Sequence, residues 1–262
     1  MTFEMRSATI GGTQISYWKG GTGEPLLYLH PAGGVMQTEF LKLLATQRTI
    51  YIPVIPGFDG TPLEPALAGP KDLAGLAAAF IEDRIGGKTD VMGVSFGGWT
   101  AMWLAVLRPD LVDLLLLEAP AGLRFGQDET TLSPEAARAN LFAYPEKAAA
   151  ISPTRDRAMA NGQAFGHYMK GVYVDEELAG RLGEVRAQTF VLMATKDITI
   201  PEATGRFIAT KVPQANVTYI YDAAHALEVD QPERTFRAVR PFLARGGAFI
   251  VNKSEDELPT AA

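Results

Sequence analysis

The sequence contains no cysteine, few histidines and no long uninterrupted hydrophobic run. The absence of cysteine from its 262 residues excludes disulfides, thiol catalysis and cysteine-ligated metal sites. With only three histidines, a histidine general base has few candidates. No apolar run approaches the roughly 18 residues that span a bilayer, and residues 1–6 lack the basic-then-apolar layout of a signal peptide. We therefore expect a cytoplasmic protein with no membrane partner.

The chain also lacks any excess or cluster of basic residues. Lys and Arg number 24 against 30 Asp and Glu, which gives a formal net charge of −6. This balance argues against nucleic acid or an anionic membrane surface as a partner. Hydrophobic residues make up 47% of the chain and charged residues 21%, values that predict a globular protein with a sizeable core. Nothing in the sequence indicates an oligomeric state.

Short apolar runs alternate with helix-like segments along most of the chain. Two opening strands, Ser7–Ile10 and Gln14–Trp18, are separated by a Gly11-Gly12 turn. Patterns typical of buried strands follow at residues 26–29, 49–55, 91–93, 114–117, 189–194 and 217–221. Helical patterns lie near residues 36–47, 71–84, 99–106, 202–211 and 231–245, the last with Asp230 and Glu233 as its predicted caps. This alternation predicts an α/β fold with a mostly parallel, eight-stranded sheet and helices on both faces.

The alternation lapses between residues 121 and 186, where helical and irregular sequence replaces it. We interpret this segment as a helical cap inserted after strand 6, over the sheet edge where ligands bind in such folds. Residues 1–120 and 187–250 then form the core, and residues 251–262 a flexible tail. The apolar residues of the cap predict a pocket for a small hydrophobic substrate. They are Leu123, Phe125, Leu141, Phe142, Tyr144, Met159, Phe165, Tyr168, Met169 and Tyr173.

The segment Gly93-Val94-Ser95-Phe96-Gly97 lies where a strand-like run meets a helix-like one. A nucleophile that stands clear of the fold needs a sharp strand-to-helix turn, and side chains at the flanking positions would clash there. Glycines two residues to either side of Ser95 satisfy that requirement. Ser95 is therefore the candidate nucleophile.

A serine hydroxyl needs a neighbouring base, and the base needs an acid that orients it. Of the three histidines, His225 follows the last strand, on a loop at the strand's carboxyl end. Asp197 follows the strand at 189–194 in the same way, and Glu118 ends the strand before the cap. The carboxyl ends of parallel strands meet at one sheet edge, so these side chains should converge with Ser95. Asp197 is the preferred acid, and Glu118 is its alternative.

This order of serine, aspartate and histidine, on a glycine-flanked turn, resembles that of the α/β-hydrolase family. The resemblance runs from about Ser7 to Arg245. It implies a triad in which Ser95 is the nucleophile, His225 the base and Asp197 the acid. Because some members carry their acid after strand 6, it also keeps Glu118 as a rival.

The segment His30-Pro31-Ala32-Gly33-Gly34 resembles the family's His-Gly-x-x-Gly loop, which contributes to the oxyanion hole. The resemblance implies that the backbone amides of Ala32 and Phe96 are the two donors, and that His30 braces the loop. Pro31 replaces the usual glycine. Because proline has no N–H and a fixed φ, it alters the loop while leaving the Ala32 donor in place.

The resemblance further implies a serine hydrolase that needs no metal and no organic cofactor. The expected substrate is a small hydrophobic carboxylic ester, lactone or thioester, cleaved through an acyl-enzyme at Ser95. Carbon–carbon bond hydrolysis of a diketone is an alternative, since capped members of the family also perform that reaction. A slow or non-catalytic ligand-sensing protein on the same fold is a further alternative.

Overall fold

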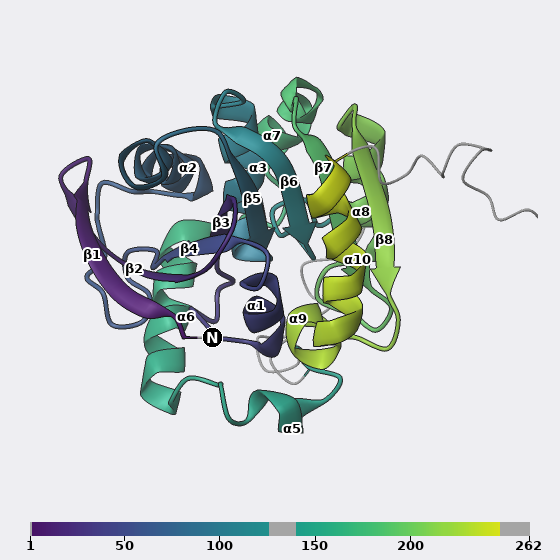
Figure 1. Cartoon of the computed structure of the whole chain (residues 1–262), viewed down its shortest axis with the longest axis horizontal. Helices are drawn as coiled ribbons and strands as arrows, with labels where there is room; N and C mark the ends of the chain where they lie inside the picture. The colour runs from purple at the N-terminus through teal and green to yellow at the C-terminus, as the bar shows by residue number, and fades with distance from the viewer. Residues whose placement is uncertain (1, 126–139, 247–262) are drawn as a thin grey trace, which may run out of the picture.

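A computed structural model describes residues 2–125 and 140–246 of the chain. Eight strands form one sheet in the order β1-β2-β4-β3-β5-β6-β7-β8 (Figure 1). The strands are β1 (Glu4–Ile10), β2 (Thr13–Gly21), β3 (Pro25–Leu29), β4 (Thr49–Pro53), β5 (Thr89–Val94), β6 (Val112–Glu118), β7 (Gln188–Ala194) and β8 (Ala215–Ile220). β2 pairs antiparallel with β1 and β4, whereas every pair from β4 to β8 is parallel. The predicted eight-stranded, mostly parallel sheet is confirmed.

Helices cover both faces of this sheet. They are α1 (Glu39–Leu44), α2 (Pro70–Phe80), α3 (Phe96–Leu107), α5 (Pro145–Ala148), α6 (Arg155–Met169), α7 (Glu176–Arg181), α8 (Glu202–Lys211), α9 (Leu227–Asp230) and α10 (Pro232–Arg245). α1, α9 and α10 pack together on one face, and α2 and α3 pack together on the other, where α8 lies against β7 and β8 (Figure 1). The central strands β3, β5 and β6 are almost wholly buried, and apolar residues stand at successive positions in them, as at residues 26–29 and 114–117. No helix within the described residues is both long and apolar enough to cross a membrane.

Two helices differ from the sequence prediction. The helix expected near residues 36–47 begins only at Glu39, because the Thr38 side chain accepts the Leu41 amide (3.2 Å) as an N-cap. The residues before Thr38 belong to the loop that follows β3. The helix expected at residues 71–84 ends at Phe80 and continues as a single π-helical stretch over Ile81–Ile85, which stops at Gly86 (φ 89°).

Within the described part of the predicted cap, α5 and α6 lie at the carboxyl end of the sheet, whereas α7 packs against α3 and precedes the amino end of β7. In Figure 1, α5 and α6 lie beyond the ends of the central strands. A single bridge between Leu123 and Val174 joins the two flanks of the predicted cap. Residues 126–139 of the predicted cap and the predicted tail, 251–262, lie outside the described residues. The domain boundaries therefore stay a prediction.

Candidate active site

Ser95 lies on the turn between β5 and α3, in a backbone conformation that is unusual for a residue with a side chain. Its φ is 51° and its ψ is −110°. Its amide donates to the Glu118 carbonyl (2.8 Å) at the end of the neighbouring strand. A Cβ on Gly93 would lie 2.4 Å from the Gly97 oxygen, and one on Gly97 would lie 2.0 Å from the Leu29 oxygen. As expected, this turn has no space for side chains at those two positions.

His225 and Asp197 reach Ser95 from the loops after β8 and β7. His225 Nε2 lies 2.9 Å from Ser95 Oγ, and His225 Nδ1 lies 2.9 Å from Asp197 Oδ2. The carboxyl group of Asp197 is fully buried, and its Oδ1 accepts the amides of Thr199 (2.7 Å) and Ile200 (3.0 Å). Because the carboxylate can only accept, Nδ1 carries the imidazole proton and Nε2 presents its lone pair to the serine hydroxyl. Such an arrangement can activate a serine as a nucleophile.

Ala32 and Phe96 are the two candidate oxyanion donors. Phe96 is the first residue of α3, whose first-turn amides have no acceptor within the helix. Among the residues described, no acceptor takes the amide of Ala32 or of Phe96. Pro31 does not prevent the turn, since its carbonyl accepts the Gly34 amide (3.0 Å) and closes it. Ala32 lies inside that turn.

His30 is buried and both of its ring nitrogens bind backbone groups. Nε2 accepts the Ile55 amide (3.0 Å), so Nδ1 carries the proton and donates to the Pro31 carbonyl (2.8 Å). Burial lowers the pKa of His30, which keeps the ring neutral. With both nitrogens engaged, His30 is suited to bracing residues 30–35, the segment that we call the oxyanion loop. His167, in the predicted cap, binds the Leu67 carbonyl (3.0 Å).

Comparison with known proteins gives the family of the chain. The sequence profile described as the alpha/beta hydrolase family matches residues 26–238, which is most of the chain. The chain belongs to the alpha/beta hydrolase family. The matched range includes all of the residues placed above in the candidate site of this hydrolase.

Individual relatives of this alpha/beta hydrolase include an esterase and a hydrolase of another kind. It is 25% identical over 249 residues to the pimeloyl-[acyl-carrier protein] methyl ester esterase of Chromobacterium violaceum, covering 85% of this chain and 95% of the relative. It is 27% identical over 125 residues to the 2-hydroxy-6-oxo-6-(2'-aminophenyl)hexa-2,4-dienoic acid hydrolase of Metapseudomonas resinovorans, covering 45% of this chain and 43% of that one. A thermophilic esterase from Thermogutta terrifontis has the same fold, with a TM-score of 0.75, 21% identity, and coverage of 92% of this chain and 98% of that one.

Glu118, the alternative acid, is placed beside a second buried carboxyl group of the hydrolase. Its Oε1 accepts the Glu228 amide (3.2 Å), and its Oε2 has no hydrogen-bond partner among the described residues. The Glu228 carboxyl group accepts the Tyr28 hydroxyl (2.8 and 2.9 Å). Burial, together with the charge of Glu228, holds the pKa of Glu118 well above its usual range. Burial also raises the pKa of Glu228 to about 7.

We expect Glu228→Gln to flatten the dependence of stability on pH. An acid whose pKa is raised in the folded state stabilises that state below its unfolded pKa, and this stability is lost as pH rises through the folded pKa. For Glu228 the loss falls between about pH 4.5 and 7. From pH 5 to pH 8, the unfolding free energy of the wild type should therefore drop by about 2 to 3 kcal/mol more than that of the variant.

Denaturant unfolding at both pH values measures this difference. Glu233→Gln is the control, because Glu233 is exposed on α10. Parallel pH profiles for the wild type and Glu228→Gln would contradict the expectation.

Sequence reasoning missed three buried side chains around the site. Asp230, predicted to cap α10, instead accepts the amides of Ala224 (2.8 Å), Ala143 (2.9 Å) and Tyr144 (3.0 Å), and so ties the His225 loop to the cap. Gln231 is the N-cap residue of α10, and its side chain makes no capping bond. The other two, Asp59 and Asn161, contact the oxyanion loop. For Asp230, the available sequence signal was that an acidic residue stands five positions after His225, the candidate base.

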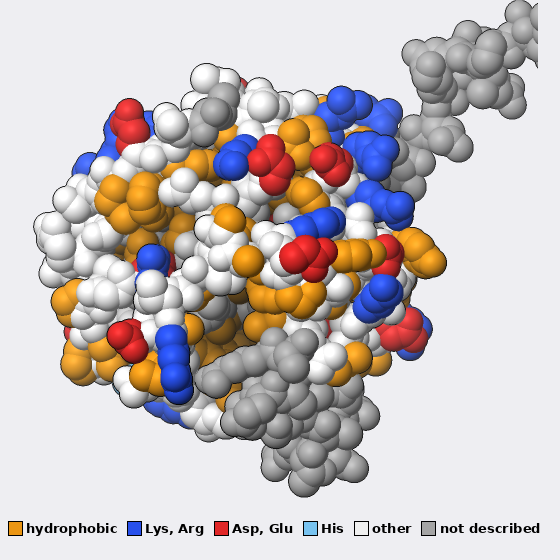
Figure 2. Space-filling model, turned by 90° about the horizontal axis from the view of Figure 1, so that it is seen from below, with side chains coloured by type: hydrophobic (Ala, Val, Ile, Leu, Met, Phe, Trp, Pro, Cys, Tyr) orange, Lys and Arg blue, Asp and Glu red, His pale blue; other side chains and the backbone are white. Residues whose placement is uncertain are grey.

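Hydrophobic side chains of the predicted cap and of the core pack together beside the candidate site. The ring of Phe96 packs against Phe58 (6.0 Å between centroids), Phe165 (5.4 Å) and Tyr168 (6.0 Å). Figure 2 views the molecule from the side on which α5, α6 and α9 lie, and hydrophobic side chains border a hollow in that surface. Phe165 and Tyr168, both in the predicted cap, thus pack on the side chain of Phe96, whose amide is a candidate oxyanion donor.

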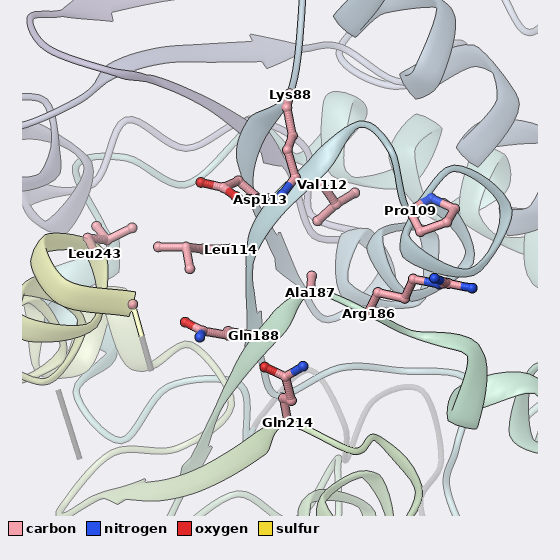
Figure 3. A pocket seen from close by; sticks show the side chains of 11 residues that line it. Lys88, Pro109, Val112, Asp113, Leu114, Arg186, Ala187, Gln188, Gln214 and Leu243 are labelled. Carbon is pink, nitrogen blue, oxygen red and sulfur yellow. Dashed lines mark hydrogen bonds and ion pairs between the residues drawn. The ribbon is translucent and has the colours of Figure 1, made fainter. Parts of the chain in front are cut away.

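A cavity of about 460 Å³ lies away from the candidate active site, at the amino ends of the central strands (Figure 3). Val112 and Gln188, at the amino ends of β6 and β7, line it together with Lys88, Asp113 and Arg186. Lys88 is paired with Asp113 (2.7 Å). None of Ser95, Asp197 and His225 contributes to this cavity. Its size therefore has no bearing on the candidate catalytic chemistry.

Proposed function

We propose that this alpha/beta hydrolase cleaves small hydrophobic carboxylic esters, lactones or thioesters through an acyl-enzyme at Ser95. The observation that carries the proposal is the continuous hydrogen-bonded chain from Asp197 through His225 to Ser95, with both distances at 2.9 Å. A serine, rather than a carboxylate, at the nucleophile position favours acyl transfer. No step of this reaction requires a metal or an organic cofactor.

Each residue then has a defined part in the reaction. His225 Nε2 takes the Ser95 proton as Oγ attacks the substrate carbonyl carbon, and the resulting oxyanion accepts the Ala32 and Phe96 amides. Each such donor lowers the barrier by about 3 kcal/mol. Collapse of this intermediate breaks the bond to the leaving group, which takes the proton from His225. Water then attacks the acyl-enzyme by the same steps, with His225 as base, and releases the carboxylic acid.

The surroundings of Phe96 support a hydrophobic substrate. Three aromatic side chains, Phe58, Phe165 and Tyr168, pack around it, and two of them come from the cap. Phe58, Phe96 and Tyr168 are buried, so Phe165 is the part-exposed ring of this cluster that would contact a substrate. The esterase relative from Chromobacterium violaceum, which aligns over most of its length, favours an ester as the substrate class.

Stopped-flow hydrolysis of p-nitrophenyl acetate and butyrate tests the proposal. An acyl-enzyme predicts a burst of p-nitrophenol that approaches one equivalent per active site wherever deacylation is slower than acylation. The apolar surroundings predict a higher kcat/KM for butyrate than for acetate. A folded protein that releases no p-nitrophenol from either ester would contradict the proposal.

Carbon–carbon bond hydrolysis is the second candidate, because one relative is a 2-hydroxy-6-oxo-dienoic acid hydrolase. The same serine and histidine could act on a ketone carbonyl in such a substrate. Loss of the absorbance of a 2-hydroxy-6-oxo-dienoate, followed beside ester hydrolysis, separates the two reactions. The larger kcat/KM identifies the reaction class.

A further inference from the structure

Asn161, near the middle of α6, is a buried polar side chain far in sequence from the candidate catalytic residues. It is 1% exposed, and every hydrogen-bond donor of its amide is used. Nδ2 donates to the Gly33 carbonyl (2.8 Å) and to Asp59 Oδ1 (3.1 Å), while Oδ1 accepts the Asp59 amide (2.8 Å). The opposite orientation of the amide would place its oxygen against two acceptors. These hydrogen bonds therefore fix the orientation of the Asn161 side chain, and Asn161 in turn holds Gly33 and Asp59 in place.

Asp59 links Asn161 to Val35, the last residue of the oxyanion loop. Its Oδ2 accepts the Val35 amide (2.8 Å), and its Oδ1 accepts Arg157 Nε (2.8 Å). Burial works to raise the pKa of Asp59, but hydrogen bonds from Arg157 and the Val35 amide outweigh it, and the pKa lies below its usual value. Asp59 is thus an anion that accepts bonds from both the loop and α6. Its own backbone has a φ of 54°, a conformation that its hydrogen bonds help to hold.

The oxyanion loop packs tightly against the side chains of Asp59 and Asn161, which leave no space for a side chain at Gly34. Gly34 has a φ of 89°, and a Cβ there would lie 2.2 Å from Asp59 Oδ1 and 2.5 Å from Asn161 Nδ2. The loop is thus held at both ends. His30 holds the first end through the core residue Ile55, and Asn161 with Asp59 holds the second end at Gly33 and Val35. Ala32 lies between them.

We propose that Asn161 is a positioning residue for the oxyanion hole, holding the loop that carries the Ala32 amide through Gly33 and Asp59. This inference rests on the proposed function for the role of Ala32. It means that a cap helix, and not the core alone, sets the geometry of one donor. The oxyanion hole is complete only while α6 is docked on the core.

Asn161→Asp tests the inference, because aspartate has the same shape but lacks both donors and faces the Asp59 carboxylate. Gln163→Ala, at an exposed position of the same helix, is the control. For p-nitrophenyl butyrate we expect kcat of the Asp variant to fall about 10- to 100-fold with KM little changed, since a displaced donor weakens the transition state most. The control should match the wild type.

A trifluoromethyl ketone separates positioning from loss of folded protein. Its hemiketal with Ser95 places an oxyanion in the hole, so its Ki should rise by the same factor by which kcat/KM falls. A merely misfolded fraction would lower the burst amplitude and leave Ki unchanged. Unchanged Ki and kcat/KM per active site in Asn161→Asp would overturn the inference.

Hydrogen–deuterium exchange of residues 29–36 tests the same inference without any substrate. Exchange in this segment should become faster in Asn161→Asp and stay unchanged in Gln163→Ala. Unchanged exchange in the Asp variant would overturn the inference. If the wild type cleaves no ester while exchange in the variant is faster, the proposed function fails and the hold of Asn161 on the loop stands.

Discussion

Replacing Ser95 with alanine is expected to lower the hydrolysis rate of p-nitrophenyl butyrate by roughly 10⁵- to 10⁶-fold and to abolish the burst. The variant keeps the turn between β5 and α3, because the backbone amide at this position still donates to the Glu118 carbonyl. It loses the oxygen that forms the acyl bond, so no covalent intermediate can accumulate. Residual turnover would come from the oxyanion donors and substrate binding alone.

Rapid-quench intact-mass spectrometry provides the direct measurement. The wild type should gain the mass of one butyryl group, whereas Ser95→Ala should gain none. Ser7→Ala, on the exposed edge strand β1, is a matched control and should behave as the wild type. A burst that persists in Ser95→Ala would place the nucleophile elsewhere and remove the acyl-enzyme from the proposal.

Asp197→Asn is expected to lower kcat by roughly 10³- to 10⁴-fold, and Glu118→Gln by no more than about 10-fold. The Thr199 and Ile200 amides bind Asp197 Oδ1, so the oxygen of the asparagine should stay on them. Its NH₂ then faces His225 Nδ1, which must become the acceptor. Nε2 gains the proton and can no longer accept one from Ser95.

Steady-state kinetics of the two variants, measured from pH 6 to 9 on the same ester, decide between the acids. The Glu118 side chain accepts the Glu228 amide, so the amide oxygen of a glutamine in its place can keep that contact and leave the base undisturbed. A larger loss in Glu118→Gln than in Asp197→Asn would give Glu118 the orienting role. For Glu118 to orient His225, the loop after β7 would also have to move, because its Asp197 now binds His225 Nδ1.

The sequence was sufficient to place the strand-end loops, because alternation of buried strands with helices leaves few topologies for a parallel sheet. Ser95, Asp197 and His225 each follow a strand, and the structure brings their side chains into one hydrogen-bonded chain. The sequence preferred Asp197, in the loop after β7, but kept Glu118, the last residue of β6, as an alternative because both lie at the same sheet edge. The direction of the Asp197 side chain depends on two loop amides that no local pattern reveals.

The hydrogen bonds of Asp59 and Asn161 with the oxyanion loop could not be predicted from the sequence, for a different reason. Asp59 and Asn161 are 102 residues apart, and their pairing depends on how α6 docks on the core. Asp230 was assigned to a helix cap because local acids commonly have that role, but it instead accepts the amides of Ala224, six residues away, and of the distant Ala143 and Tyr144. A buried carboxylate accepts hydrogen bonds from whichever unpaired amides the tertiary fold brings near it, even where its local sequence favours a helix cap.

The position of the cap between β6 and β7 has a consequence for synthesis of the chain. β6 has a run of four buried leucines and lies between β5 and β7 in the finished sheet. On the ribosome, the whole segment between Glu118 and Gln188 must emerge before β7 can pair with it. If β6 pairs with β5 during that interval, its other edge presents unpaired backbone N–H and C=O groups beside apolar side chains, a combination that templates aggregation. Ser95 is already present at that stage, while Asp197 and His225 are still unmade.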